Sequence, residues 1–417
     1  MGADPSSPTH AALAAARASY GRLLAWLAWQ WRDVAAAEDA LAEAFAAALE
    51  HWPTQGVPAS PEGWLVTAAK RQLLMAARRR RLAEDPAFTA LFPDAEAPAE
   101  EAVAIPDARL RLMLVCAHPA IDPSVHCALM LQVVLGVDAA RIAGAWLISP
   151  EAMTKRLTRA KAKIRDARIR FEVPDGADLE ERVQSVLEAI YGAFTLDWGR
   201  APEDAASDLS DEAVYLAELV VAHLPDHAEA NGLLALLWLA ESRRSARTGP
   251  AGEFIPLDRQ DPKRWDAGLI GQANARLAHA AAQRNPGPFQ IEAAIQAAHA
   301  SRAETGVTPW PDIVRLYERL LACAPTIGAR IGHAIATAKA DNDPAAGLAL
   351  LHAIDSSAVI KHQPWWAAQG HLCERSGATD KALVAYRRAL ELTNAPELRA
   401  YFERCIAALV PASRAEF

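Results

Sequence analysis

The sequence predicts an all-α protein built from several helical domains. Apolar residues recur at spacings of three and four along nearly the whole chain, which places them on one face of successive helices. Alanine-rich segments favour helix by propensity, and no segment shows the alternation of apolar and polar residues that is typical of a half-buried strand. The 417 residues correspond to about two to four domains, which is enough for more than one apolar core.

The composition is that of a globular protein. Apolar residues make up 52% of the chain and charged residues 23%, with 21 Gly and 27 Pro, which excludes collagen-like and disordered classes. The longest apolar segments, such as 231–240, are shorter than the ~18 residues of a membrane helix, and the N-terminus lacks a signal-peptide pattern. We therefore expect a cytoplasmic protein that does not contact a membrane. The five cysteines are scattered without a CxxC pair, which indicates reduced thiols.

Charge divides the chain into modules. Residues 1–173 hold 20 lysines and arginines against 19 acids, whereas residues 174–417 hold 23 against 32, so the net charges are +1 and −9. The first part gathers six basic residues within 63–83 and nine within 141–170. Between these clusters, 84–107 carries seven acids, four prolines and no base. The pattern indicates two basic modules joined by an acidic linker, after a flexible N-terminus at residues 1–9.

The strongest local pattern is a helix-turn-helix. Asp138 is suited to cap a short helix that runs to Trp146, and Ser149, followed by Pro150, is suited to cap a longer one. At about 100° per residue, the longer helix has a narrow apolar stripe opposite a largely basic face. This stripe consists of Met153, Leu157, Ala160 and Ile164. A solvated basic face on an ordinary helix pair is the alternative interpretation.

The basic face of the longer helix predicts contacts with DNA. A recognition helix places its N-terminal half against base edges in the major groove, and Lys155 and Arg159 lie opposite the apolar stripe. The later basic residues would contact flanking phosphates, namely Arg156, Lys161, Lys163 and Arg165. The candidate DNA-binding residues of this helix are Glu151, Thr154, Lys155, Arg156, Thr158, Arg159 and Lys163.

The first basic module predicts another helix, from about Glu62 to Leu82. Its basic residues Lys70, Arg71, Arg78 and Arg81 share an arc of roughly 100° that would follow a nucleic-acid backbone. Trp52 and Trp64 flank the loop 53–61, where they would stack on the bases of a separated strand or simply belong to the core.

The preceding helix shows the opposite charge. Its predicted buried stripe is Leu41, Phe45, Ala48 and Trp52. Three acids project the other way, Asp39, Glu43 and Glu50, and offer an acidic face to a basic partner or to water.

A helical-repeat pattern occupies the C-terminal part. Residues 363–396 fit the roughly 34-residue tetratricopeptide spacing at Trp366, Gly370, Gly377, Ala382, Tyr386 and Ala389. Earlier repeats are indicated by Tyr317, Leu320 and Pro325 and, in degenerate form, by Ala334, Ala346 and Ala353. Stacked helix pairs present a concave surface for another chain, although a purely structural role or a role in holding the protein's own N-terminal modules remains open. The loop 248–266 contains both charged and aromatic residues, which would attach this part to a neighbouring domain. The candidate interdomain residues are Arg259, Asp261 and Trp265.

The usual signatures of enzymes are absent from the sequence. It contains no GxGxxG after a strand, no GxxxxGK[ST], no HExxH and no GxSxG. Cys116, His118, His126 and Cys127 have donor types that zinc prefers, but their spacing is not a zinc pattern, and core packing is favoured. We assign no catalytic residue, metal or cofactor.

Together these residues resemble an extracytoplasmic-function (ECF) sigma factor of the sigma-70 family. AEDALAEAF (37–45) resembles the region 2 helix that docks on RNA polymerase, and GWLVTAAKRQLLMAARRRR (63–81) resembles the helix that engages the −10 element. Residues 116–165 resemble region 4, which reads the −35 element. Segments such as IPLDRQDPKRWD (255–266) and GPFQIEAAIQAAHA (287–300) resemble the subgroup with a tetratricopeptide-like extension of the DUF6596 type, which is unrelated to the SnoaL-like extension.

The resemblance implies a domain plan and a function. Region 2 would occupy 10–83, the acidic linker 84–106, region 4 residues 107–173 and the helical extension 174–417. The expected function is promoter-specific transcription initiation, with core RNA polymerase and promoter DNA as partners and the extension governing activity. A small YCII-like (DGPF) protein is a further partner that the resemblance suggests. The alternative is a helical-repeat adaptor or DNA-binding regulator whose sigma-like module no longer melts promoters, because Ala42 and Met75 stand where such sigma factors usually carry Gln and Asp.

Overall fold

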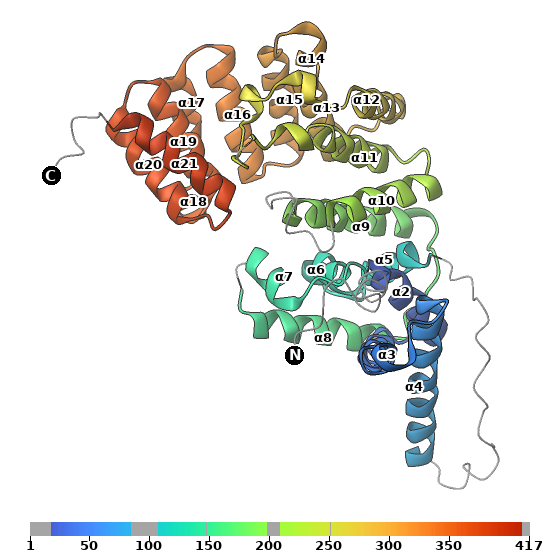
Figure 1. Ribbon diagram of the computed structural model, residues 1–417. Coiled ribbons are helices and arrows are strands. Elements are labelled where there is room, and N and C mark those ends of the chain that lie inside the picture. The colour runs from blue at the N-terminus through green and yellow to red at the C-terminus, as the bar shows by residue number, and fades with distance from the viewer. Residues whose placement is uncertain (1–17, 85–106, 147, 198–208, 251, 411–417) are drawn as a thin grey trace, which may run out of the picture. The chain divides into compact units, whose positions relative to one another are not determined.

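The protein is all-α, as the sequence predicts (Figure 1). The computed structural model describes residues 18–84, 107–146, 148–197, 209–250 and 252–410. In these ranges it contains helices and one isolated β-bridge, between Thr248 and Phe254, but no strand. None of the helices described is long and apolar enough to cross a membrane. The predicted N-terminal segment and nearly all of the acidic linker lie outside the described residues.

The chain divides into two compact units, and the boundary between them falls within α10 (Leu209–His223). The first unit reaches Leu216 and the second begins at Ala217. The other helices of the first unit are α2 (Tyr20–Trp31), α3 (Val34–Gln55), α4 (Pro61–Glu84), α5 (Arg109–Cys116), α6 (Pro123–Val133), α7 (Ala139–Ala145), α8 (Pro150–Asp166) and α9 (Gly176–Asp197).

Helices α2, α3 and α4 pack together around leucine and tryptophan side chains. Leu23, Leu27 and Leu41 are completely buried, and Trp52 is 2% exposed. The carboxylate of Asp33 begins α3 by accepting a hydrogen bond from the Ala36 amide at 3.0 Å. Of the four residues predicted for the buried stripe of α3, three are buried, Leu41, Ala48 and Trp52, whereas Phe45 is half-buried.

Helix α2 also approaches α6 closely, and a glycine permits this approach. A Cβ added at Gly21 would lie 1.8 Å from the carbonyl oxygen of Val134, just after the end of α6. Because that atom belongs to the backbone, it cannot move aside as a flexible side chain would. Gly21 thus allows α2 to pack directly against the end of α6.

Two helices, α7 and α8, begin at the predicted capping residues. The carboxylate of Asp138 accepts a hydrogen bond from the Arg141 amide at 2.8 Å, and the Ser149 hydroxyl accepts one from the Ala152 amide at 3.2 Å. The first helix, α7, ends one residue before the predicted Trp146. The apolar stripe of α8 is buried at all four predicted positions.

Helix α9 belongs to the first unit, beyond the predicted boundary at residue 173. It packs against α5 and α6, and the imidazole of His126 on α6 lies 3.3 Å from the hydroxyl of Ser185 on α9. Val183, Val186 and Leu187 of α9 are completely buried. The core of the first unit is therefore completed by a helix that follows residue 173.

The second unit is a succession of packed helices. After the end of α10 it contains α11 (Ala228–Glu241), α12 (Ala267–Ala282), α13 (Pro288–Ala300), α14 (Arg302–Thr305), α15 (Trp310–Cys323), α16 (Ile327–Ala340), α17 (Pro344–His352), α18 (Ser356–Val359), α19 (Gln363–Arg375), α20 (Thr379–Glu391) and α21 (Pro396–Leu409). Three short 3₁₀ helices, η3 (Arg244–Ala246), η4 (Leu257–Arg259) and η5 (Pro262–Arg264), form the segment between α11 and α12. From α15 onward, each longer helix packs against the next one along the chain.

The C-terminal helix pair explains the repeat pattern in physical terms. A Cβ at Gly370 on α19 would lie 2.6 Å from the ring of Tyr386 on α20, so only glycine lets the two helices approach. Gly377 has φ +77° in the turn between them, where glycine is favoured. The degenerate repeat differs from the prediction, because Gly347 is buried against α16 whereas Ala353 is exposed.

Candidate nucleic-acid interface

Helix α8 separates an apolar face from a polar one. Met153, Leu157 and Ile164 are each 1% exposed, which fixes the rotation of the helix on its core. The seven candidate DNA-binding residues are all exposed, and they are Glu151, Thr154, Lys155, Arg156, Thr158, Arg159 and Lys163. The N-terminal half of α8 therefore presents polar side chains without any change in its packing.

The two threonines of this face use their hydroxyl protons in hydrogen bonds to the backbone of α8. Thr154 donates to the carbonyl of Pro150, and Thr158 donates to the carbonyl of Thr154, both at 2.9 Å. A hydroxyl oxygen whose proton is engaged still accepts hydrogen bonds. These oxygens are thus suited to the exocyclic amino groups that adenine and cytosine present in the major groove.

Lys161 does not belong to the exposed basic face. Its ammonium nitrogen lies 2.5 Å from a carboxylate oxygen of Glu38 on α3, and the two side chains are only 12% and 22% exposed. The contact of Lys161 with phosphate stays a prediction, and it would require the ammonium to leave or share the carboxylate of Glu38. Arg165 pairs with its neighbour Asp166 at 2.9 Å, but both side chains remain about half exposed or more.

The basic residues of α4 lie in different environments. The ammonium of Lys70 lies 4.5 Å from the ring centroid of Trp26, so this lysine packs on the core of the first unit. Arg71 and Arg78 are exposed, whereas the side chain of Arg81 lies outside the described part. A phosphate-binding stripe on this helix would thus rest on the two arginines rather than on Lys70.

Trp52 and Trp64 meet at the N-terminal end of α4. Their ring centroids are 5.6 Å apart at an interplanar angle of 70°, which is an edge-to-face contact. Trp52 is buried in the core, but Trp64 is only half-buried. Of the two, Trp64 is the ring that retains surface for an unstacked base.

The acidic face of α3 borders a cleft of about 460 Å³. Asp39 and Glu43 line it, together with Arg79 of α4 and Arg165 of α8. Glu50 is exposed on the same helix but lies outside the cleft. Two of the three candidate polymerase-docking residues are therefore brought to one concave surface, where acids from α3 face cations from the two basic helices.

The contacts described for the candidate interdomain residues lie within the second unit. Asp261 caps η5 by accepting a hydrogen bond from the Lys263 amide at 3.0 Å. Trp265 is 6% exposed beneath the guanidinium of Arg302, which lies 5.0 Å from its ring centroid. Arg259 is exposed. The segment that carries them is folded onto its own unit, and their interdomain role stays a prediction.

Cys116 and His118, at the end of α5, and His126, on α6, contact other parts of the protein. The Nδ1 atom of His118 accepts a hydrogen bond from the Ala120 amide at 3.0 Å, and the Nε2 atom of His126 lies 3.1 Å from the carbonyl of Ile121. Burial raises the pKa of the Cys116 thiol, which disfavours the thiolate that zinc requires. No group of three or more His, Cys, Asp or Glu in the described ranges is placed to hold a metal ion.

A buried charge network escaped the sequence analysis. Arg109 is 7% exposed, and it binds the carboxylate of Asp107 at 2.6 Å and the carboxylate of Glu212 on α10. The Tyr215 hydroxyl donates to the same Asp107 carboxylate at 3.1 Å. Burial alone would raise the pKa of Asp107, but the hydrogen bonds and charge of Arg109 lower it below its ordinary value. This network ties α10 to the start of α5.

Comparison with known proteins agrees with the geometry. Residues 16–83, which contain α2, α3 and most of α4, match the family model of Sigma-70 region 2. A protein of Rhizobium meliloti (strain 1021), described as uncharacterized protein R00370, is 34% identical over 376 residues, which is 88% of either chain. The match to region 2 supports a member of the sigma-70 family. Residues 182–281 match a family of unknown function, DUF6596, and no solved structure matches. A sigma-70 region 2 implies interaction with core RNA polymerase and promoter DNA.

Proposed function

We propose that this sigma-70 family member is an ECF-type sigma factor that directs promoter-specific transcription initiation and is not itself an enzyme. The observation that carries the proposal is the two-faced α8, whose apolar stripe is buried while its candidate DNA-binding residues are exposed. In this proposal residues 107–173 are region 4, and α8 reads the −35 element.

The exposed cations of α8 have two different tasks. Lys155 and Arg159 read base edges, since they lie opposite the buried stripe of the helix. Arg156 and Lys163 bind phosphates and set affinity rather than sequence preference. On α4, the exposed Arg71 and Arg78 follow the backbone at the −10 element, where Trp64 offers a surface for stacking.

The acidic face of α3 docks on polymerase. Asp39 and Glu43 are exposed in their cleft, and an exposed charge exchanges water for a basic partner at small cost. Docking at this cleft leaves the neighbouring Glu38 free to keep its ion pair with Lys161.

The helical extension governs activity in this proposal. Its net charge of −9 would favour masking of the basic faces, whereas the resemblance implies that the extension is needed for transcription. We propose that the extension is needed for transcription. It holds the two DNA-binding modules in an arrangement that polymerase can bind, through Arg259, Asp261 and Trp265. A YCII-like protein as a further partner stays a prediction.

The test begins by finding the promoters. The chain is overexpressed under control, transcript 5′ ends are sequenced, and the promoters found are used in runoff transcription with purified core polymerase. We expect transcripts that depend on the full chain. Asp39→Lys with Glu43→Lys should reduce both copurification with core enzyme and transcription at least tenfold, whereas Glu318→Lys, an exposed acid of the second unit, should not.

The extension is tested by truncation at a place that respects the packing. A cut after Val173 would remove α9 from α6, so a loss of activity would not identify the role of the extension. A cut after Leu224 retains α9, Glu212 and Tyr215. We expect this shorter chain to be inactive; stronger transcription than from the full chain would establish the extension as an inhibitor. Absence of any polymerase-dependent transcript, with DNA binding retained, would favour the adaptor function instead.

A further inference from the structure

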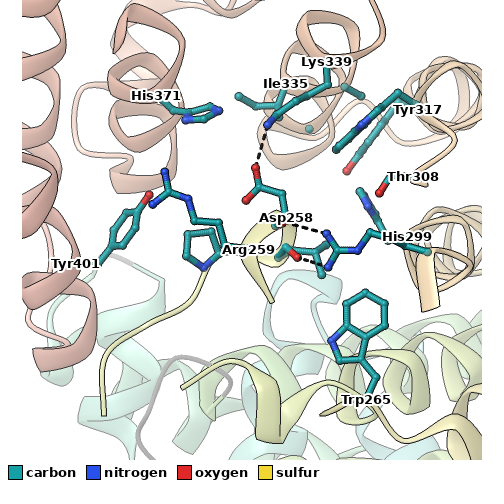
Figure 2. A pocket seen from close by; sticks show the side chains of 16 residues that line it. Asp258, Arg259, Trp265, His299, Thr308, Tyr317, Ile335, Lys339, His371 and Tyr401 are labelled. Carbon is teal, nitrogen blue, oxygen red and sulfur yellow. Dashed lines mark hydrogen bonds and ion pairs between the residues drawn. The ribbon is translucent and has the colours of Figure 1, made fainter. Parts of the chain in front are cut away.

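The second unit contains a cavity of about 310 Å³ (Figure 2), and two of its lining residues, Arg259 and Trp265, are also candidate interdomain residues. It lies among η4, α13, α15, α16, α19 and α21, so distant parts of the sequence meet there. Its volume is at the lower end of the range of about 300–1,000 Å³ that small-molecule sites occupy. The cavity is therefore of a size for one small ligand.

The walls of the cavity are largely aromatic. Trp265, Trp310, Tyr317 and Tyr401 line it, and the imidazole of His299 meets the ring of Trp310 edge to face at 5.3 Å. Aromatic rings favour flat partners, through offset stacking and edge contacts. A planar, conjugated group is thus the kind of ligand body that these walls would hold.

The charges of the lining favour an anion. Three cations line the cavity, Arg259, Arg302 and Lys339, but only one acid does, Asp258. Lys339 pairs with Asp258 at 2.9 Å. The remaining two cations have no carboxylate partner among the residues that the structure describes. This excess is notable because the C-terminal part of the chain is acidic as a whole.

Arg302 serves the fold, whereas Arg259 is available to a ligand. The guanidinium of Arg302 donates to the carbonyls of Leu257, Asp258 and Gln260, each at 2.9 Å, so it holds η4 in place. Arg259 is exposed, and Figure 2 shows its guanidinium between His371 and Tyr401. It is thus the cation that a ligand reaches without breaking an existing ion pair.

His299 lies in the cavity wall in a largely buried environment. Burial is the main cause that lowers its pKa to about 4, and the charges of Arg243 and Arg302 lower it further. The imidazole is consequently neutral near pH 7. An anion placed in the cavity would be attracted by the cations that oppose protonation of this histidine.

We infer that this cavity binds a small aromatic carboxylate, with its ring between the aromatic walls and its carboxylate on Arg259. A single unpaired, accessible cation suits a monoanion such as a carboxylate better than a phosphate dianion, which would need Lys339 to leave Asp258. This inference rests on the second unit alone, and a carboxylate bound to Arg259 would compete with the proposed interdomain role of that residue.

The test is isothermal titration calorimetry of the full chain with 2-naphthoate, and with the neutral 2-naphthamide as the matched compound. We expect saturable binding of one naphthoate and at least tenfold weaker binding of the amide. Arg259→Gln should weaken naphthoate binding at least fivefold. The matched control Arg319→Gln, at an exposed arginine outside the cavity, should leave binding unchanged.

A second variant tests the location without changing charge. A Cβ at Gly332 would lie 2.4 Å from the phenol tip of Tyr317, so Gly332→Ala should push this ring into the cavity and weaken binding at least fivefold. Absence of saturable binding, equal binding of acid and amide, or unchanged binding in both variants would overturn the inference. So would binding of the peptide Gly-Ser-Gly-Phe through its free C-terminus in the absence of naphthoate binding, because the site would then be one for a peptide.

Discussion

The ion pair between Lys161 and Glu38 should couple the stabilities of α8 and α3. Its atoms are 2.5 Å apart and its side chains are 12% and 22% exposed, so it is shielded from water far more than an ordinary surface pair. Exposed pairs contribute about 0.2–1 kcal/mol, whereas breaking a buried pair costs about 3–5 kcal/mol. For this partly buried pair we expect a coupling free energy of about 1–3 kcal/mol.

A double-mutant cycle with Lys161→Met and Glu38→Gln measures this coupling. Opening of the first unit is followed by amide hydrogen exchange of peptides from α3 and α8 in the full chain, so unfolding of the second unit does not contribute. Each single variant leaves one polar group without its partner and should lower the free energy of opening. The double variant should be less destabilised than the sum of the two.

The matched control replaces Lys163, which is exposed on the same helix, by Met in the same cycle with Glu38→Gln. This pair should show no coupling. A Lys161–Glu38 coupling below about 0.5 kcal/mol, equal to that of the control, would show that the ion pair does not join the two helices and would leave Lys161 available to contact phosphate.

Three further predictions concern both units. Gly370→Ala should destabilise the C-terminal helix pair by about 1–3 kcal/mol in thermal unfolding, because the new methyl group overlaps the tyrosine ring of α20. The control Gly271→Ala lies at an exposed helical site with open space and should stabilise the protein by up to about 1 kcal/mol. The pKa of about 4 for His299 in the folded protein lies below the unfolded value of 6.5, so the unfolded chain binds more protons between these pH values. The urea midpoint of the second unit should therefore fall as the pH drops from 6.5 to 4. This decrease should be smaller in His299→Gln. Lys155→Ala should cost about 1–3 kcal/mol of promoter affinity and relax the base preference at one position. Lys163→Ala should weaken the affinity for all DNA sequences alike and lower the slope of log affinity against log salt concentration by about one. Equal effects of the two variants on DNA binding in fluorescence anisotropy would contradict this assignment.

Local chemistry was enough to predict α8 from the sequence. Its cap, its first-turn proline and its stripe are determined by residues within one helix and the turn before it. The same holds for the buried stripe of α3, although Phe45 is only half-buried because it lies at the edge of the packed face. On α4 the buried face consists of Leu65, Ala69 and Leu73, whereas Met75 is 45% exposed.

Contacts between distant residues could not be predicted in this way. Glu38 and Lys161 are 123 residues apart, and Arg109 and Glu212 are 103 apart, so no helical spacing relates them. The sequence also did not show that α9 packs in the first unit, because the apolar stripe of a helix does not identify the helices that cover it. Such partners are chosen by tertiary packing, which a single sequence does not reveal.

The three sides of α8 show how the first unit joins its functions. One side is buried and holds the helix in the core, one is tied to α3 through Lys161, and the polar side remains free for DNA. Because Glu38 and Asp39 are adjacent on α3, the residue that anchors α8 lies beside the residue proposed to dock on polymerase. Movement of α3 on docking would therefore be transmitted to α8 through a short, partly buried ion pair rather than through a flexible linker. If the coupling is confirmed, promoter reading and polymerase binding become parts of one packed structure, and a Lys161→Met variant should retain DNA affinity while losing the effect of polymerase on it.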